Sequence, residues 1–290
     1  MALSLLTVVT INGILSFMFN PGAWVDTGLW YHGFFNLSYL PSLLMRLAIM
    51  ASLAGIYALI SFSSFKETKF RRKILRYSSK WILAGFISMP ILATWLFKTL
   101  AQEARDTIIT GIRSPYISEY FAPLSRITAI SLVLIILVIL LVYFGPYRNP
   151  KNFSIKLAVF ISICVLFVTI SSEWLRRAIR RPYLIQGYMY ANGILKRDIR
   201  KINLNGYISS AKWAKDSEEP EKIGEQIFRD QCSSCHSPSG MKGLISERDY
   251  QSLEAFLFTI HETNKEKNPY IILMPPLAVK KLILKHLLST

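Results

Sequence analysis

The chain has 290 residues, of which 52% are apolar, 18% are charged and only three are cysteine, and its mean hydropathy is +0.33. Because soluble domains carry about 25% charged residues, this composition indicates a membrane protein and argues against a disordered or disulfide-built one. The formal net charge is +16, but 23 of the 34 basic residues and only 7 of the 18 acidic ones precede position 205. The positive excess therefore predicts membrane topology rather than a nucleic-acid partner.

Five apolar runs have about the 20 residues needed to cross a bilayer and are predicted to be transmembrane helices. They cover approximately 2–19, 40–62, 81–100, 123–145 and 157–173. The connection at 66–80 carries seven positive charges and one negative, and the one after the fourth run carries Arg148, Lys151 and Lys156. Both are predicted to be cytoplasmic, which places the amino terminus inside and everything after Glu173 outside. The first run lacks a basic leader and a clear cleavage site, which favours a retained helix over a signal peptide.

Ionisable side chains within spans are costly and are therefore candidates for function. Those of this chain are predicted to gather on the outer membrane face: Arg46, Lys98, Arg126 and Glu173 near helix ends, and Arg176, Arg177, Arg180 and Arg181 just beyond the fifth helix. Snorkelling to the head groups explains any one of them alone. As a cluster they oppose the positive-inside rule, which predicts an anionic partner: a lipid, haem propionates or a carboxylate of another subunit.

A motif with defined chemistry lies at 224–236, which read GEQIFRDQCSSCH. Cys232, Cys235 and His236 form C-x-x-C-H, the attachment signature of c-type haem, in which two thiols add to vinyl groups and the histidine binds the iron. A zinc site would need two further ligands at matching spacing. A redox dithiol needs a preceding strand and does not require His236. We therefore predict one covalent haem c. The third cysteine, Cys164 in the fifth span, is predicted to be a small buried apolar residue.

Residues on either side of this motif are predicted to complete the haem site. Three apolar residues at helical spacing predict a short amphipathic helix over 221–230: Ile223, Ile227 and Phe228. After the motif, the segment MPP begins at Met274, which is predicted to be the sixth iron ligand, with His261 and His286 as competitors. A Met/His pair raises the reduction potential relative to bis-histidine ligation.

The site of haem attachment agrees with the predicted topology, because c-type haem is attached on the outer side of the bacterial cytoplasmic membrane. We therefore predict an all-α protein with three parts. Residues 1–174 form a five-helix transmembrane bundle, 175–204 a basic periplasmic connection, and 205–290 a class I cytochrome c domain. The membrane part contains His32 as its only histidine, so a bis-histidine haem b between its helices needs a second subunit or an unusual ligand such as Met45.

Two resemblances to known families extend this interpretation. The carboxy-terminal part resembles class I cytochrome c over about 80 residues, through GEQIF, CSSCH and MPP. The membrane part resembles subunit I of cytochrome bd quinol oxidases over about 170 residues. INGILSFMFNPGAW and FFNLSYLPSLLMRLAIMASLAGIYALI are similar to two of its helices. In EWLRRAIRRPYLIQGYMYANG, four residues match in kind the family's Arg-Gln-Pro-Trp segment and the glycine after it: Arg180, Pro182, Tyr183 and Gly187.

Departures from the bd family limit what the resemblance implies. Where the family has a histidine for its low-spin haem b, this chain has Met45 and Arg46, and where it has a glutamate before Arg-Gln-Pro-Trp there is Arg177, with Glu173 one turn earlier. The family's first helix, which carries another haem histidine, has no counterpart. The resemblance thus implies a half-length companion of a larger subunit I-like protein that holds the b-type haems, with Arg180 binding haem propionates on the outer side.

Together these patterns predict a membrane-anchored electron-transfer subunit of the bacterial inner membrane, with its cytochrome c domain in the periplasm. It would pass electrons through one haem c between a quinol-linked, bd-oxidase-like membrane complex and a periplasmic carrier, with no catalytic residue of its own. The alternative is a terminal oxidase in which this chain helps build the oxygen-reducing or quinol site, and a third reading is a purely structural scaffold. The sequence leaves open whether quinone or haem b contacts this chain.

Overall fold

The computed structural model divides the chain into two compact units, Met1–Arg181 and Pro182–Thr290. It describes residues 2–113, 118–179, 184–210 and 219–233, together with positions 237, 249, 255, 257, 261, 276 and 277. The described residues are mostly helical, and their only strand-like pairing is an isolated antiparallel bridge between Met189 and Leu195. For this part of the chain the all-α prediction is confirmed.

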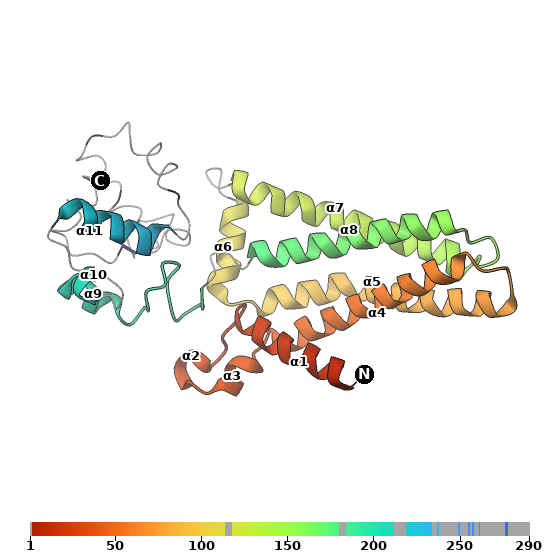
Figure 1. The fold of residues 1–290 in the computed structure, drawn as a ribbon, viewed down its shortest axis with the longest axis horizontal. Coiled ribbons are helices and arrows are strands. Elements are labelled where there is room, and N and C mark those ends of the chain that lie inside the picture. The colour runs from red at the N-terminus through yellow and green to blue at the C-terminus, as the bar shows by residue number, and fades with distance from the viewer. Residues whose placement is uncertain are drawn as a thin grey trace. The chain divides into compact units, whose positions relative to one another are not determined.

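Four helical segments of the first unit are long and apolar enough to cross a membrane (Figure 1). They are α4 (Tyr39–Ser63), α5 (Lys69–Thr99), α7 (Ser118–Val142) with the π-helical turn η1 (Tyr143–Tyr147) that continues it, and α8 (Ile155–Ile179). They correspond to the second to fifth predicted spans. Their length and composition confirm the prediction of a membrane protein.

The third span begins earlier than predicted. Hydropathy places its start at position 81, but α5 begins at Lys69, where Thr68 Oγ1 accepts a hydrogen bond from the backbone N–H of Arg71 at 3.1 Å. Most of the basic connection predicted at 66–80 is therefore the first three turns of a helix. The prediction differs because an apolar window detects only the lipid-facing part of a helix, whereas the helix itself extends to its cap.

The first predicted span is shorter in the structure. α1 (Ala2–Phe17) has 16 residues, which reach about 24 Å, against about 30 Å of hydrocarbon in a bilayer. Two short helices follow it, α2 (Trp24–Thr27) and α3 (Trp30–Phe34). Membrane crossing by α1 stays a prediction, and so does the placement of the two chain ends on opposite sides.

Helices α4 and α5 approach closely because glycines lie at their contact. A Cβ at Gly85 would overlap Ser52 Oγ and lie 2.7 Å from the carbonyl oxygen of Ala48. A Cβ at Gly55 would lie 2.8 Å from the carbonyl oxygen of Ser78. Small residues permit such approach between membrane helices. A core of fully buried side chains joins this pair to α7 and α8: Leu59, Leu75, Ile82, Phe86, Val138, Val142 and Ile161.

The carboxyl end of α5 is tied to the chain segments around it. The carbonyl oxygen of Thr99 accepts hydrogen bonds from Asn20 Nδ2 at 2.8 Å and from Ser38 Oγ at 2.9 Å. Helix α6 (Gln102–Arg113) follows, and a small core forms there from Phe19, Leu100 and Ile108. The end of α1, the beginning of α4 and the end of α5 therefore meet at one end of the bundle.

A single buried arginine organises the opposite end of the bundle. Arg71 is 5% exposed. Its Nε donates to the carbonyl oxygen of Phe62 at 3.0 Å, and its Nη2 donates to those of Ser63 at 3.0 Å and Phe153 at 2.7 Å. Its Nη1 donates to the carbonyl oxygen of Pro150 at 3.2 Å. One guanidinium thus joins the end of α4, whose last carbonyls lack intrahelical donors, to the connection between η1 and α8.

The second unit contains four short helical segments among its described residues. They are α9 (Ile199–Asn205), α10 (Tyr207–Ser210), α11 (Pro220–Ile227) and the π-helical turn η2 (Phe228–Cys232). The segment 175–204, predicted as a connection, holds the end of α8, the bridge and most of α9. Most positions after 233 lie outside the described residues, so the cytochrome c fold stays a prediction.

Candidate haem site

Cys232 lies at the end of a continuous helical segment. α11 begins with Pro220, which suits the first turn because proline lacks the N–H that is unpaired there. Ile227 is fully buried, and Ile223 and Phe228 are half-buried. The predicted amphipathic helix before the motif is therefore confirmed. Cys232, at the end of this helical segment, is half-buried.

The helix changes its winding just before the motif. In η2 the backbone N–H of Ser233 donates to the carbonyl oxygen of Phe228 at 3.0 Å, a bond that spans five residues instead of four. A π-helical turn inserts one residue into the helical path and so redirects the side chains after it; such turns are common at functional sites. Of the predicted ligands, Cys235, His236 and Met274 lie outside the described residues, as does Arg180.

A tyrosine and an aspartate join α10 to this turn. Tyr207 Oη donates to Asp230 Oδ2 at 3.3 Å, two residues before Cys232. Burial, together with the charge of Asp230 and this hydrogen bond, raises the pKa of Tyr207 to about 12. The phenol therefore stays protonated, and able to donate to Asp230, above pH 10, where the tyrosine of an unfolded chain would ionise.

Replacing Tyr207 with phenylalanine is expected to remove a phenol that titrates near pH 12 rather than near the ordinary value of about 10. Between these values the folded state binds more protons than the unfolded state, so this pair's contribution to stability is complete below pH 10 and falls as pH rises to 12. The measurement is the difference in phenolate absorbance between wild type and Tyr207→Phe. Asp230→Asn is the matched control and should move the titration back toward pH 10. A difference spectrum that titrates at pH 10 in the wild type would contradict the assignment.

A turn in the predicted connection reaches the segment that carries Met274. Asn192 Oδ1 accepts from the backbone N–H of Ile194 at 3.3 Å, and its Nδ2 donates to the carbonyl oxygen of Pro276 at 3.2 Å. Pro276 is buried and follows Met274 by two residues. The Asn192-Gly193 dipeptide is a typical turn signal, but no local pattern indicates a partner 84 residues away. Sequence reasoning missed this contact.

The predicted cluster of charges at the α5 carboxyl end is partly assembled. Arg176 forms an ion pair with Glu173, in which Nε and Oε2 are 2.8 Å apart, and both interact electrostatically with Arg46. Lys98, Arg126 and Arg177 are exposed, and Arg181 lies outside the described residues. Arg176 is therefore paired within its own chain, and the anionic partner expected for the cluster as a whole stays a prediction.

A buried asparagine that sequence reasoning missed holds Arg46. Asn12 is fully buried, and its Oδ1 accepts from Arg46 Nε at 3.0 Å and from Ser42 Oγ at 2.8 Å. Its Nδ2 donates to the carbonyl oxygen of Tyr39 at 2.9 Å. The signal in the sequence was a single amide within an apolar run, which does not reveal its partner.

Comparison of the chain with protein-family models, with curated proteins and with solved structures found no match. Within the described ranges, no group of three or more histidine, cysteine, aspartate or glutamate side chains could hold a metal ion. This absence does not extend to the C-x-x-C-H motif, because Cys235 and His236 are outside those ranges.

Proposed function

We propose that this chain is a membrane-anchored electron-transfer subunit that carries one covalent haem c. The observation that carries the proposal is the C-x-x-C-H motif, whose first thiol ends an amphipathic helix in a unit distinct from the four-span unit. The donor set fits this cofactor: two thiols at thioether spacing and an adjacent imidazole, beside a helix with a buried apolar face.

Each residue of the proposed site has a defined task. Cys232 and Cys235 would anchor the porphyrin, and His236 and Met274 would bind the iron, a pair that favours a higher potential than two histidines. The bound haem supplies one-electron Fe(III)/Fe(II) chemistry. The protein supplies orientation and the exclusion of water, here through Ile227 and its half-buried neighbours.

The resemblance to cytochrome bd subunit I supports a proposal for the partners. The four-span unit would bind a larger, subunit I-like membrane protein with b-type haems and quinol, in the bacterial inner membrane, and the second unit would meet a periplasmic electron carrier. Arg180 would bind propionates of a haem in the subunit I-like protein. The alternative, a terminal oxidase in which this chain helps build the oxygen-reducing or quinol site, rests on the same resemblance.

The test is purification of the full chain with its bound partners. We expect a haem-stained band of this chain's mass after denaturing electrophoresis, a reduced-minus-oxidised spectrum with c-type and b-type bands, and reduction of haem c by quinol. A reporter fused at Thr290 should lie in the periplasm. No haem-stained band, or a cytosolic reporter, would overturn the proposal, while cyanide-sensitive oxygen uptake by the complex would favour the alternative.

Asn192 offers a prediction about the predicted sixth ligand. Asn192→Asp keeps the oxygen that accepts from Ile194 and replaces the donor to Pro276 with a repelling oxygen. We expect weaker Met274 ligation and a fall in reduction potential of tens of millivolts, since 59 mV is a tenfold change for a one-electron couple. Redox titration measures it, with Asn205→Asp at the end of α9 as the control. If Met274→Ala shifts the reduction potential but Asn192→Asp leaves it unchanged, the proposed role of Asn192 is contradicted.

A further inference from the structure

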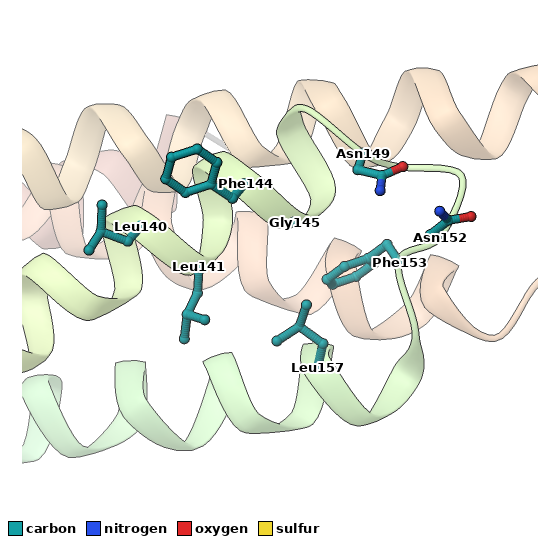
Figure 2. Close-up of a pocket in the computed structure, with 8 residues that line it drawn as sticks. All are labelled: Leu140, Leu141, Phe144, Gly145, Asn149, Asn152, Phe153 and Leu157. Atoms are coloured by element: carbon teal, nitrogen blue, oxygen red, sulfur yellow. The ribbon is translucent and has the colours of Figure 1, made fainter.

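A groove opens between α7, η1 and α8 (Figure 2). It lies at the end of the bundle where Arg71 donates to the connection between η1 and α8. Its volume is about 370 Å³. Figure 2 shows Leu141 and Leu157 pointing into the space between the helices, with Asn149 and Asn152 on the connection at its end. The groove therefore has apolar walls along the two helices and amide groups at one end.

The backbone around the groove is fixed by contacts within the chain. The π-helical turn η1 carries Gly145, whose missing side chain leaves the wall open beside Leu157, and Phe153 is buried beneath the connection. Arg71 holds the carbonyl oxygens of Pro150 and Phe153 at 3.2 and 2.7 Å. The backbone that lines the groove is thus held by contacts of the chain itself, so binding would require little ordering of the chain.

The charge around the groove is positive. Arg148, Lys151 and Lys156 are exposed on and just after the connection. No acidic residue occurs in the sequence between 120 and 172. On the connection between α4 and α5, Glu67 forms an ion pair with Arg72, in which Oε1 and Nε are 3.3 Å apart. The buried Arg71 adds a further cation, and its four hydrogen-bond acceptors are all backbone carbonyls.

We propose that this groove binds one phospholipid whose head group carries a net negative charge. The groove lies where two spanning helices end, so its apolar walls suit an acyl chain and its amide end lies at the level of the head groups. Amide N–H groups and cations are donors for phosphate oxygens. A zwitterionic head group would bring an ammonium toward at least three cations, and a neutral quinone would gain nothing from them. The proposal does not depend on haem binding.

The test is native mass spectrometry of the full chain in mild detergent, with phosphatidylglycerol or phosphatidylcholine of identical acyl chains. We expect one retained phosphatidylglycerol, bound at least about tenfold more tightly than phosphatidylcholine. Arg148→Gln with Lys151→Gln should weaken it about 25-fold, at about fivefold per cation. Leu141→Trp should expel the lipid at unchanged charge.

The matched control is Lys69→Gln with Lys73→Gln. These exposed residues lie at the same end of the bundle, but on a helix that contributes no residue to the groove, so we expect unchanged binding. Arg148 and Lys151, by contrast, directly precede the lining residues Asn149 and Asn152. Equal binding of the two lipids, equal losses in both double variants, or displacement of the lipid by inorganic phosphate alone would overturn the proposal. The double variants change exposed residues only, so they keep the test valid if Leu141→Trp fails to fold.

Discussion

Replacing both Cys232 and Cys235 with alanine is expected to abolish the haem-stained band of this chain after denaturing electrophoresis. Thioether bonds would be the only covalent links between the proposed haem and the chain, so without them any haem held through His236 and Met274 would leave on denaturation. Cys232→Ala alone leaves one thioether site and should give a weaker band. The measurement is the intensity of the haem stain relative to the amount of this chain on the same blot.

Cys164 provides the control for that experiment. It is the third cysteine, and it is 6% exposed within α8, as the sequence predicted for a small apolar residue of a span. Cys164→Ala removes one thiol without touching the motif, so its band should equal that of the wild type. A band that persists in the double variant, or that is lost equally with Cys164→Ala, would contradict haem attachment at the motif.

The parts of the fold that the sequence predicted depend on local composition. The spans around Tyr39–Ser63 and Ile155–Ala178 follow from the length of apolar runs, because lipid selects composition residue by residue. The start of α5 at Lys69 was missed because a helix continues past the bilayer as far as its cap, and hydropathy does not record caps. Helix α1 shows the same limit, because the apolar run predicted at 2–19 is long enough to cross a bilayer but the helix ends at Phe17.

The candidate site divides in the same way. The spacing of Cys232 and Cys235 and the amphipathic helix before them are local patterns, and the helix is found as predicted. The contact of Asn192 with Pro276 joins residues 84 apart, and that of Asn12 with Arg46 joins residues 34 apart. Hydrogen-bond partners at such separations are chosen by the packed fold, so no pattern in a single sequence identifies them.

Arg71 is the residue whose replacement should cost the four-span unit most. Arg71→Met keeps most of the apolar stem of the side chain but removes the donor to the carbonyl oxygens of Phe62, Ser63, Pro150 and Phe153. Of these four, the carbonyl oxygen of Phe62 keeps a backbone donor, the N–H of Phe65 at 3.4 Å. A buried acceptor left unpaired costs about 1–3 kcal/mol, and the loss at Ser63, Pro150 and Phe153 together should cost about 3 kcal/mol or more. Arg71→Lys restores the charge and three donors but not the planar fork, so its stability should lie between those of wild type and Arg71→Met.

The neighbouring arginine separates this effect from loss of charge. Arg72 pairs with Glu67 at 3.3 Å, with side chains 43% and 38% exposed, and exposed pairs of this kind contribute about 0–1 kcal/mol. Thermal unfolding of the full chain in detergent should therefore rank wild type and Arg72→Met together, then Arg71→Lys, then Arg71→Met. Equal melting temperatures for Arg71→Met and Arg72→Met would show that the carbonyl network does not hold α4 to the η1–α8 connection. Because this connection forms the polar end of the groove, Arg71→Met should also weaken lipid retention, whereas Arg72→Met should not.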